Sequence, residues 1–345
     1  MTTTITHLLD DAALGGVTRF LDALERQLGP SIVQKRVIAG PGAKRQPCLD
    51  ADLVVVHSTM NWSKLPWLMA LRAHRGRQPI VLVEHSYTGA FETNHVKKPL
   101  RFRAMLRMAY AIVDRVVAVS YGQAAWMRRT RLLPACKLAV IAPFTDCMAL
   151  ATLPLPPTAR GPLRLGAYGR YCGQKDFSTL IAAMALVDAD VATLSLRGFG
   201  PDGEHLRVQA APLGHVRVGD KIDELSDFLA GIDALVVPSS YEPFGQVALE
   251  ARLAGRPLIV TAVDGLPEQV EPGAGLVVPA GDPQALALAI RQMAGQHAAK
   301  GWAEMSNAAR TSALDHVTTS TLRWQALICE LVPRVADDAR PRRVA

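Results

Sequence analysis

The sequence predicts an α/β protein made of two Rossmann-like, doubly wound domains that face each other across a cleft. The length of 345 residues suits two domains of ordinary size. Short apolar runs alternate with longer amphipathic runs along the whole chain, which is typical of parallel sheets with helices on both faces. Four prolines among residues 153–162 interrupt the alternation near the middle and predict a linker. A content of 49% hydrophobic and 20% charged residues excludes a disordered or fibrous protein.

The first predicted domain covers residues 1–152. Its short apolar runs are expected to be strands buried on both faces, and the amphipathic runs between them are expected to be helices. The expected strands cover 4–9, 31–38, 53–57, 80–84, 116–119 and 138–141, and the expected helices cover 16–28, 63–75, 100–112 and 122–131.

The second predicted domain covers residues 163–320 and repeats the alternation. Residues 321–345 are expected to form a helix and an Arg-rich tail that return to the first domain. Ligands of such folds bind outside the carboxyl ends of the strands, so the loops after the strands are the predicted sites of chemistry. The expected strands cover 163–168, 192–196, 216–218, 234–237, 257–260 and 275–278, and the expected helices cover 177–187, 222–230, 246–254 and 283–294.

The positive charge is concentrated in the first half of the chain. The net charge is +7, with 20 Lys and Arg against 10 Asp and Glu in residues 1–157, and 18 against 21 in the remainder. From Lys97 to Arg131, nine basic residues accompany a single acidic one, Asp114. This pattern fits either an ordinary surface helix or a basic amphipathic surface that docks on anionic lipid. The helix expected over 100–112 has an apolar face formed by Phe102, Met105, Leu106 and Ala109. Around this face lie Arg101, Arg103 and Arg107.

Nothing in the sequence predicts secretion, a membrane span or a zinc site. The five cysteines include no C-x-x-C, the first residues do not resemble a signal peptide, and no apolar run approaches a membrane-spanning length. We therefore expect a cytoplasmic protein, peripheral at the inner face of the plasma membrane if the basic stretch binds lipid. Without a recognition motif or an aromatic platform, nucleic acid is not an expected partner.

Two motifs invite other interpretations. Residues 198–203 spell G-x-G-x-x-G after a strand, as in dinucleotide-binding proteins, with Asp220 downstream. The motif follows the second strand of its domain, and Pro201 stands where a helix should offer N–H groups, so a nicotinamide or flavin enzyme is disfavoured. Two D-x-D sequences resemble metal motifs but precede strands, away from the expected binding edge, and are interpreted as solvated acids. These are Asp50-Ala-Asp52 and Asp188-Ala-Asp190.

The strongest pattern lies between residues 239 and 261. A predicted strand ends, a loop with Pro and Gly follows, and a helix begins near Gln246, where free N–H groups can bind an anion or a sugar hydroxyl. Glu242 and Glu250 frame this element. On one helix they would lie about 12 Å apart, beyond the roughly 5 to 9.5 Å that a glycosidase acid pair needs. They are interpreted as two contacts to one extended ligand, with helix-capping acids as the alternative.

Three further segments accompany the Glu242-x7-Glu250 element: 169–181, with Gly169, Arg170 and Lys175; 198–201; and 261–268. Together they resemble the retaining, metal-independent glycosyltransferases of family 4, which have the two-domain GT-B fold. The resemblance implies an enzyme that transfers a sugar, of hexosyltransferase type, from a nucleoside-diphosphate sugar to a hydroxyl of a glycan or lipid-linked acceptor. Cell-surface polysaccharide or glycolipid synthesis is the implied process, with the acceptor at the first domain and the nucleotide sugar at the second.

The resemblance also implies roles for individual residues. Arg170 and Lys175 would bind the diphosphate with no metal and no other cofactor. Glu242 would bind the donor sugar, Glu250 the ribose, and His85 would lie near the donor sugar. Arg170, Lys175, Glu242 and His85 are thus the expected catalytic residues, and domain closure would complete the site. The implied donor-binding set consists of Gly15, Gly16, Gly169, Phe244, Gly245, Gln246, Val247 and Glu250.

Three segments depart from the family pattern. Residues 141–146 lack the usual Asn-Gly turn, Asp176 replaces a glycine after Lys175, and Asp264-Gly265 replaces Gly-Gly before Glu268. None of these changes removes a contact to phosphate or hydroxyl, so transferase activity is still expected. Two alternatives remain: a non-catalytic protein of this fold that binds a nucleotide sugar or glycan, and a nucleotide-sugar epimerase of similar fold.

Overall fold

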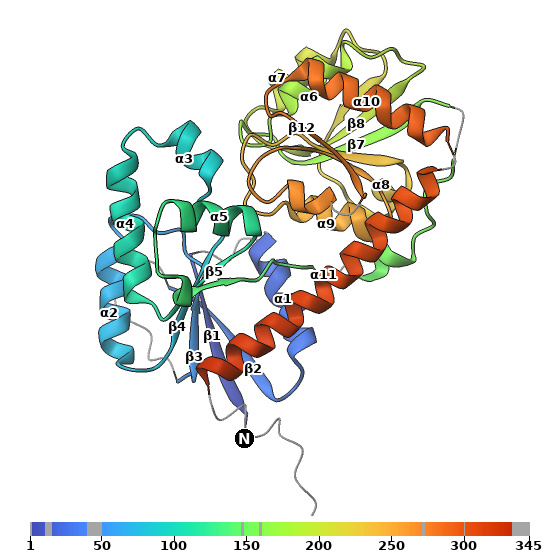
Figure 1. Cartoon of the computed structure of the whole chain (residues 1–345). Helices are drawn as coiled ribbons and strands as arrows, with labels where there is room; N and C mark the ends of the chain where they lie inside the picture. Colours follow the sequence, from blue (N-terminus) through green and yellow to red (C-terminus); the bar gives the residue numbers. More distant parts are fainter. Residues whose placement is uncertain are drawn as a thin grey trace, which may run out of the picture. The chain divides into compact units, whose positions relative to one another are not determined.

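The chain forms two compact α/β units (Figure 1). Unit 1 consists of Met1–Asp146 and Val317–Ala345, and unit 2 of Cys147–His316. The computed structural model describes residues 2–10, 16–39, 50–145, 148–158, 161–270, 273–299 and 301–332.

Unit 1 is built on a parallel six-stranded sheet with the order β2-β1-β3-β4-β5-β6. The last helix, α11 (Gly301–Leu331), contributes to unit 1 from Val317 onward. The strands are β1 (Thr3–Leu9), β2 (Ile32–Ile38), β3 (Leu53–Val56), β4 (Ile80–Glu84), β5 (Arg115–Ala118) and β6 (Leu138–Val140). The other helices are α1 (Gly16–Leu28), α2 (Leu65–Arg75), α3 (Gly89–His95), α4 (Pro99–Ile112), α5 (Tyr121–Arg129) and the short η1 (Ala135–Lys137).

Helices cover both faces of this sheet (Figure 1). On one face, α2, α4 and α5 pack against strand residues such as Val54 and Leu82, both 0% exposed. On the other face, the ring centroid of Phe20 on α1 lies 5.5 Å from that of Phe144 and 6.0 Å from that of Trp324, which is on α11. Because both faces are covered, the central strands are continuously apolar, as the sequence pattern predicted.

Unit 2 contains a second parallel six-stranded sheet, with the order β12-β11-β10-β7-β8-β9. The strands are β7 (Leu163–Arg170), β8 (Ala192–Phe199), β9 (Val216–Gly219), β10 (Ala234–Val237), β11 (Leu258–Thr261) and β12 (Gly275–Val278). The helices are η2 (Met148–Thr152), α6 (Phe177–Met184), α7 (Gly203–Ala210), α8 (Leu225–Ala230), α9 (Gln246–Leu253), η3 (Pro267–Val270), α10 (Pro283–His297) and the first part of α11.

The core of unit 2 lies between its sheet and the layer formed by α6, α7 and α10 (Figure 1). Leu180 of α6 and Ile290 of α10 are 0% exposed there, together with Leu196 of β8. The helix α9 packs on β10 and β11. The predicted α/β fold with two parallel sheets is confirmed.

The bounds of α1, β4, β10 and β12 agree with the sequence prediction, and the other strands and helices predicted before residue 300 differ by a few residues at their ends. The C-terminal helix, predicted within 321–345, instead covers Gly301–Leu331, and the predicted Arg-rich tail lies outside the described residues. The helices α3 and α7 were not predicted. The Pro-rich segment predicted as a linker is bonded to unit 2, because Arg256, Arg310 and His297 contact the carbonyl oxygens of Pro154, Leu153 and Pro157 at 2.9, 2.6 and 3.1 Å. Within the described part of the chain, no helix is both long enough and apolar enough to cross a membrane.

Candidate active site

The loops after β7 and β10 meet in unit 2. These two strands are neighbours at the point where the strand order reverses, since β8 and β9 extend to one side and β11 and β12 to the other. Such a point opens a crevice at the carboxyl ends of the strands, where doubly wound folds bind ligands. The N–H of Ser240 donates to the carbonyl oxygen of Gln174 at 2.9 Å, and the side-chain amide of Gln174 donates to the carbonyl oxygen of Tyr241 at 3.2 Å. These bonds hold the two loops side by side.

Lys175 and Glu242 form an ion pair between these loops, from Nζ to Oε2. Their side chains are only 16% and 10% exposed. The hydroxyl of Ser239 donates to the same carboxylate oxygen at 3.1 Å. Charges shielded from water interact more strongly than charges on the surface. The structure thus brings two of the predicted catalytic residues into direct contact.

Arg170 is the last residue of β7 and is exposed. In the ranges that the structure describes, its guanidinium has no hydrogen-bond or ion-pair partner. The predicted residue Gly169 immediately precedes it. A guanidinium presents a rigid fork of donors that matches phosphate geometry. The end of β7 therefore offers a cation that can bind an anion without first breaking another contact.

The G-x-G-x-x-G glycines pack against the backbone beside Arg170. A Cβ on Gly198 would lie 2.0 Å from the carbonyl oxygen of Gly169, and one on Gly200 would lie 2.3 Å from that of Tyr171. Only glycine permits two backbones to approach so closely. These glycines therefore shape the loop after β7, which accounts for them without a dinucleotide.

Two aspartates that depart from the family pattern adopt left-handed backbone conformations, with φ of 46° at Asp176 and 45° at Asp264. Aspartate tolerates this region better than most residues. The Asp176 carboxylate accepts the N–H of Thr179 and caps α6. The Asp264 carboxylate accepts the N–H of Glu242 at 3.1 Å, and the N–H of Gly265 donates to the Glu242 carbonyl at 3.2 Å. Each aspartate thus keeps the shape expected of glycine, and Asp264 also fixes Glu242.

The segment from Phe244 to Val247 leads into α9. Gly245, with φ of 89°, caps the helix, and Gln246 and Val247 are its first residues. The side-chain amide of Gln269 donates to the carbonyl oxygen of Phe244 at 3.1 Å and so fixes the entry to the helix. The start of a helix presents backbone N–H groups and a positive dipole end, here on the same loop as the ion pair.

Glu250 lies within α9 and is 0% exposed. Its Oε2 accepts a hydrogen bond of 2.6 Å from the hydroxyl of Tyr168 on β7, and that hydroxyl lies 3.4 Å from the carbonyl oxygen of Val247. Glu250 therefore joins α9 to β7. Tyr168 was not predicted as a site residue, because its link to Glu250 depends on the strand order.

In unit 1, the described site residues lie at the carboxyl edge of the sheet. Gly16 is the first residue of α1, whereas Gly15 lies outside the described residues. His85 directly follows β4. The carboxylate of Glu84 accepts the N–H groups of Ser86 and Tyr87 at 2.9 and 3.0 Å, which fixes the turn that presents His85. Burial raises the pKa of Glu84 and lowers the pKa of His85 to about 4.

Two histidines that were not predicted as site residues, His57 and His7, continue from His85 in a row of side chains within hydrogen-bonding distance of one another. Nδ1 of His57 lies 2.9 Å from Nε2 of His85, and Nε2 of His57 lies 2.9 Å from Nδ1 of His7. The signal was present in the sequence, since these histidines lie near the carboxyl ends of strands, which meet at one edge of a parallel sheet.

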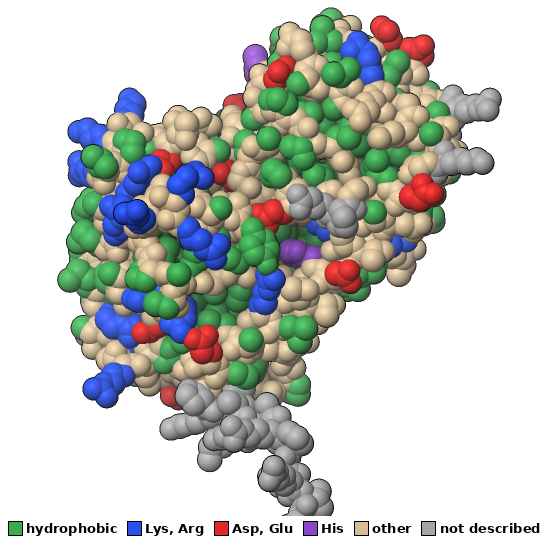
Figure 2. Space-filling model, in the orientation of Figure 1, with side chains coloured by type: hydrophobic (Ala, Val, Ile, Leu, Met, Phe, Trp, Pro, Cys, Tyr) green, Lys and Arg blue, Asp and Glu red, His purple; other side chains and the backbone are tan. Residues whose placement is uncertain are grey.

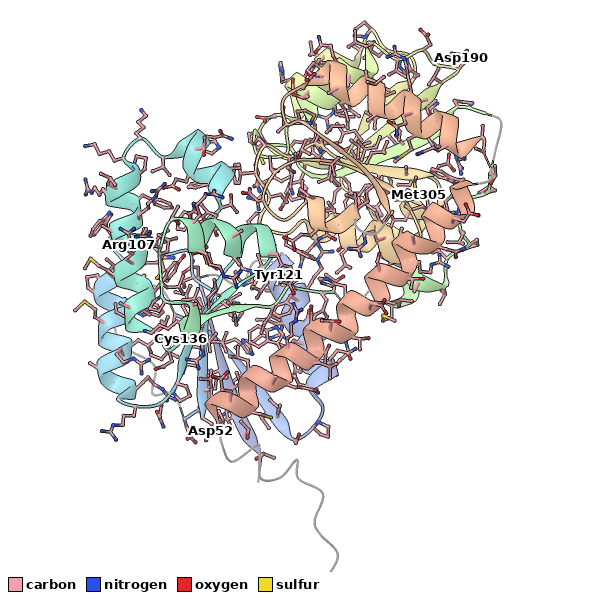
Figure 3. All side chains as sticks on the ribbon, in the orientation of Figure 1. Asp52, Arg107, Tyr121, Cys136, Asp190 and Met305 are labelled. Carbon is pink, nitrogen blue, oxygen red and sulfur yellow. The ribbon has the colours of Figure 1, made fainter. Side chains whose placement is uncertain are left out.

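The D-x-D sequences lie at the entries of strands. Figure 3 shows Asp52 immediately before β3 and Asp190 before β8. The Asp52 carboxylate accepts the N–H of Thr4 at 2.9 Å. Among the described residues, no three side chains of His, Cys, Asp or Glu gather in a way that could hold a metal ion.

Two family models match most of the chain. Residues 43–148 match the model described as Glycosyltransferase Family 4, and residues 162–296 match the model described as Glycosyl transferases group 1. The chain is a family 4 glycosyltransferase. Four of the candidate site residues lie within the match to the group 1 model, namely Arg170, Lys175, Glu242 and Glu250.

Known proteins resemble this glycosyltransferase over most of its length. The lipopolysaccharide core biosynthesis glycosyltransferase LpsE of Rhizobium meliloti is 27% identical over 301 residues, covering 81% of this chain and 85% of the relative. A crystal structure of HepE from Anabaena with UDP and glucose has a TM-score of 0.75 at 19% identity, over 95% of this chain and all of that chain. Sucrose-phosphate synthase from Thermosynechococcus elongatus has a TM-score of 0.74 at 24% identity, over 96% of this chain and all of that one. The fold is GT-B.

Proposed function

We propose that this glycosyltransferase moves a sugar from a nucleoside-diphosphate sugar to a hydroxyl of a glycan or lipid-linked acceptor, with retention of anomeric configuration and without a metal ion. The observation that carries the proposal is the shielded Lys175–Glu242 pair between the loops after β7 and β10, together with Arg170 at the end of β7, whose guanidinium has no partner among the described residues. A diphosphate suits the two cations, and a sugar hydroxyl suits the carboxylate.

The main catalytic contribution is stabilisation of the leaving group. Negative charge develops on the departing diphosphate while the sugar becomes oxocarbenium-like. Arg170, Lys175 and the N–H groups at the start of α9 are cationic or positively polarised groups placed to meet that charge. Two protein cations can supply the neutralisation that a metal ion supplies in other transferases.

Retention follows from attack on the face that the leaving group departs from, with the departing phosphate taking the proton of the acceptor hydroxyl. Glu242 is held by Lys175 and Ser239, and its backbone by Asp264 and Gly265. A carboxylate fixed in this way is suited to binding sugar hydroxyls rather than to moving as a nucleophile.

The remaining assignments rest on the family resemblance. Glu250 would contact the ribose, and His85 the donor sugar. The start of α9 and the glycines would bring backbone N–H groups close to the donor, through Gly15, Gly16, Gly169, Phe244, Gly245, Gln246 and Val247. Relatives named for lipopolysaccharide core synthesis support an acceptor in cell-surface polysaccharide or glycolipid assembly.

The test is release of nucleoside diphosphate from a panel of UDP-, GDP- and ADP-sugars, with UDP-sugars first because the fold neighbour from Anabaena binds UDP. We expect one donor to be consumed, and NMR of the product to show the anomeric configuration of the donor. Activity should persist in EDTA. Tight donor binding without release, even with glycan and lipid acceptors present, would instead indicate a binding protein, and interconversion of the donor sugars would indicate an epimerase.

We further propose that unit 1 contacts anionic lipid through an α2–α4 surface, defined by Trp62, Met69, Lys97, Lys98, Leu100, Arg101 and Met108. Figure 2 shows Lys and Arg side chains gathered on the side of unit 1 that carries α4. Its large apolar side chains are unusually open, with Leu100 at 79% and Met69 at 56% exposed. Arg101 lies over the Trp62 ring, 5.5 Å from its centroid. Cations interleaved with apolar groups suit an interface with anionic headgroups.

Two arginines of the predicted lipid-binding helix have internal partners instead. Arg103 pairs with Glu92 at 2.6 Å, and Arg107 (labelled in Figure 3) donates to the carbonyl oxygens of Arg131 and Thr130 at 3.0 and 2.9 Å. Met105, Leu106 and Ala109 face the core, as an ordinary surface helix requires. These arginines are therefore unsuitable for testing lipid binding.

Replacing Lys97, Lys98 and Arg101 together by glutamate should weaken co-sedimentation with phosphatidylglycerol vesicles at least tenfold, because each cation near the surface contributes about 1 kcal/mol. Wild-type binding should also fall as salt rises. Lys221→Glu in unit 2, an exposed lysine, is the control and should bind as the wild type does. Vesicle binding that is insensitive to both the triple change and salt would refute the lipid contact.

A further inference from the structure

Four side chains form a continuous hydrogen-bonded chain across four neighbouring strands of unit 1. Gln34 is on β2, His7 on β1, His57 directly after β3, and His85 directly after β4. Oε1 of Gln34 lies 2.9 Å from Nε2 of His7, Nδ1 of His7 lies 2.9 Å from Nε2 of His57, and Nδ1 of His57 lies 2.9 Å from Nε2 of His85. Each histidine thus uses one ring nitrogen toward each neighbour.

The three rings are neutral near pH 7. His7 is 1% and His57 7% exposed. Burial lowers the pKa of His7 and of His85 to about 4, and burial together with the two neighbouring rings holds the pKa of His57 well below its usual value. A neutral imidazole has one N–H and one lone pair, so each ring that donates to one neighbour must accept from the other. All bonds of the chain therefore run in one direction.

The amide of Gln34 sets that direction. Its Oε1 can only accept, so Nε2 of His7 carries a proton and Nδ1 of His7 is an acceptor. The same reasoning places the proton on Nε2 of His57 and then on Nε2 of His85. Nδ1 of His85 is left with its lone pair, and among the described residues it has no hydrogen-bond partner.

We propose that Gln34, His7 and His57 are positioning residues that hold His85 in the Nε2–H tautomer, so that its Nδ1 is a fixed acceptor for a hydroxyl of the ligand. The chain ends at an amide, which does not take up a proton, so the arrangement fixes a tautomer and does not conduct protons. This inference rests on the proposed function for the identity of the ligand, a nucleotide sugar whose hydroxyl would donate to Nδ1.

The turn that carries His85 is fixed independently of the ring. The Glu84 carboxylate accepts the hydroxyl of Tyr110 at 3.0 Å besides the two N–H groups of the turn. The side-chain amide of Gln123 donates to the carbonyl oxygens of Glu84 and Tyr87 at 3.0 and 2.8 Å. Because the backbone of His85 is already held in this way, what the histidine chain adds is the orientation and tautomer of the ring.

The tautomer can be read directly from long-range 1H–15N correlation spectra of the full chain labelled on histidine, at pH 7.5. A His85→Gln variant identifies the His85 signals among the nine histidines. We expect protonated Nε2 and bare Nδ1 at His85. In Gln34→Met, which removes the terminal acceptor, the two nitrogens of His85 should shift toward averaged values. Lys35→Met is the matched control, because its side chain lies on the opposite face of β2 and should leave His85 unchanged.

Kinetics give a second measurement. Gln34→Met should raise KM for the donor about fivefold, which corresponds to the loss of roughly one hydrogen bond between His85 and the donor. The value of kcat should change much less. His57→Phe, which removes the direct partner of His85, should change the His85 tautomer in the same way. If either variant unfolds, the other still tests the inference.

Each outcome separates the inference from the proposed function. Protonated Nδ1 at His85 in the wild type, or an unchanged His85 signal in a folded Gln34→Met variant, would overturn the tautomer inference even if sugar transfer is observed. If the tautomer changes as expected while no nucleotide sugar is bound or consumed, the positioning chain stands and the proposed function fails.

Discussion

Replacing Lys175 by alanine should lower kcat/KM for the nucleotide-sugar donor about 100- to 1000-fold, the usual loss when one preorganised donor to a developing negative charge is removed. The change removes the ammonium that would meet the diphosphate, and it also leaves Glu242, 8% exposed, without its cation. Release of nucleoside diphosphate under initial-rate conditions measures the loss. Lys175→Arg retains a charge and should lose less.

Lys221→Ala, an exposed lysine of the same unit, is the control and should keep wild-type activity. A thermal melt must show that the Lys175→Ala protein remains folded, so that the loss can be assigned to the site. If a folded Lys175→Ala protein kept activity within a few-fold of the wild type, Lys175 would have no part in stabilising the leaving group.

Gly198→Ala should destabilise unit 2 by about 3 kcal/mol or more, at the upper end of overpacking effects. The added methyl group would lie 2.0 Å from the carbonyl oxygen of Gly169, a backbone atom that cannot move aside as a flexible side chain could. Relief requires separating the ends of β7 and β8, which also displaces Arg170. Urea unfolding measures the loss of stability, and donor turnover below the new midpoint measures the effect on the site.

Gly173→Ala is the matched control in the neighbouring loop, because nothing lies within 4 Å of a Cβ there and its φ is not positive. It should unfold at the wild-type urea concentration and turn over donor normally. Equal urea midpoints for the Gly198→Ala and Gly173→Ala variants would show that the ends of β7 and β8 can separate at little cost in free energy, and would contradict a tight contact between Gly198 and Gly169.

The central strands could be predicted from the sequence because both faces of each sheet are covered there. A run such as Ile80–Glu84 is almost wholly apolar for that reason, and its ends coincide with a change to polar residues. Two short helices escaped prediction. The helix α3 has only seven residues, and α7 follows Pro201, which argues against a helix at that point although the helix begins two residues later.

The contacts between residues of the candidate site could not be predicted, because they depend on the strand order, which the sequence does not show directly. Lys175 and Glu242 were each proposed as ligand contacts, but their pairing over 67 positions of sequence follows from β7 lying next to β10. The role of Asp264 was hidden for the same reason, since its partner Glu242 lies on the loop after the neighbouring strand. Asp264, which replaces a glycine of the family pattern, keeps a positive φ and adds a hydrogen bond to Glu242.

If the donor binds at the ion pair between Lys175 and Glu242, the site should respond to a combination of chemical groups in the ligand rather than to charge alone. A free phosphate that drew Lys175 away would strand a buried carboxylate, and a neutral sugar that occupied Glu242 would leave the ammonium uncompensated. Only a molecule that brings an anion and hydroxyl donors at the correct separation satisfies both at once. We therefore expect the proposed donor site to discriminate against inorganic phosphate and free hexoses through the Lys175–Glu242 ion pair.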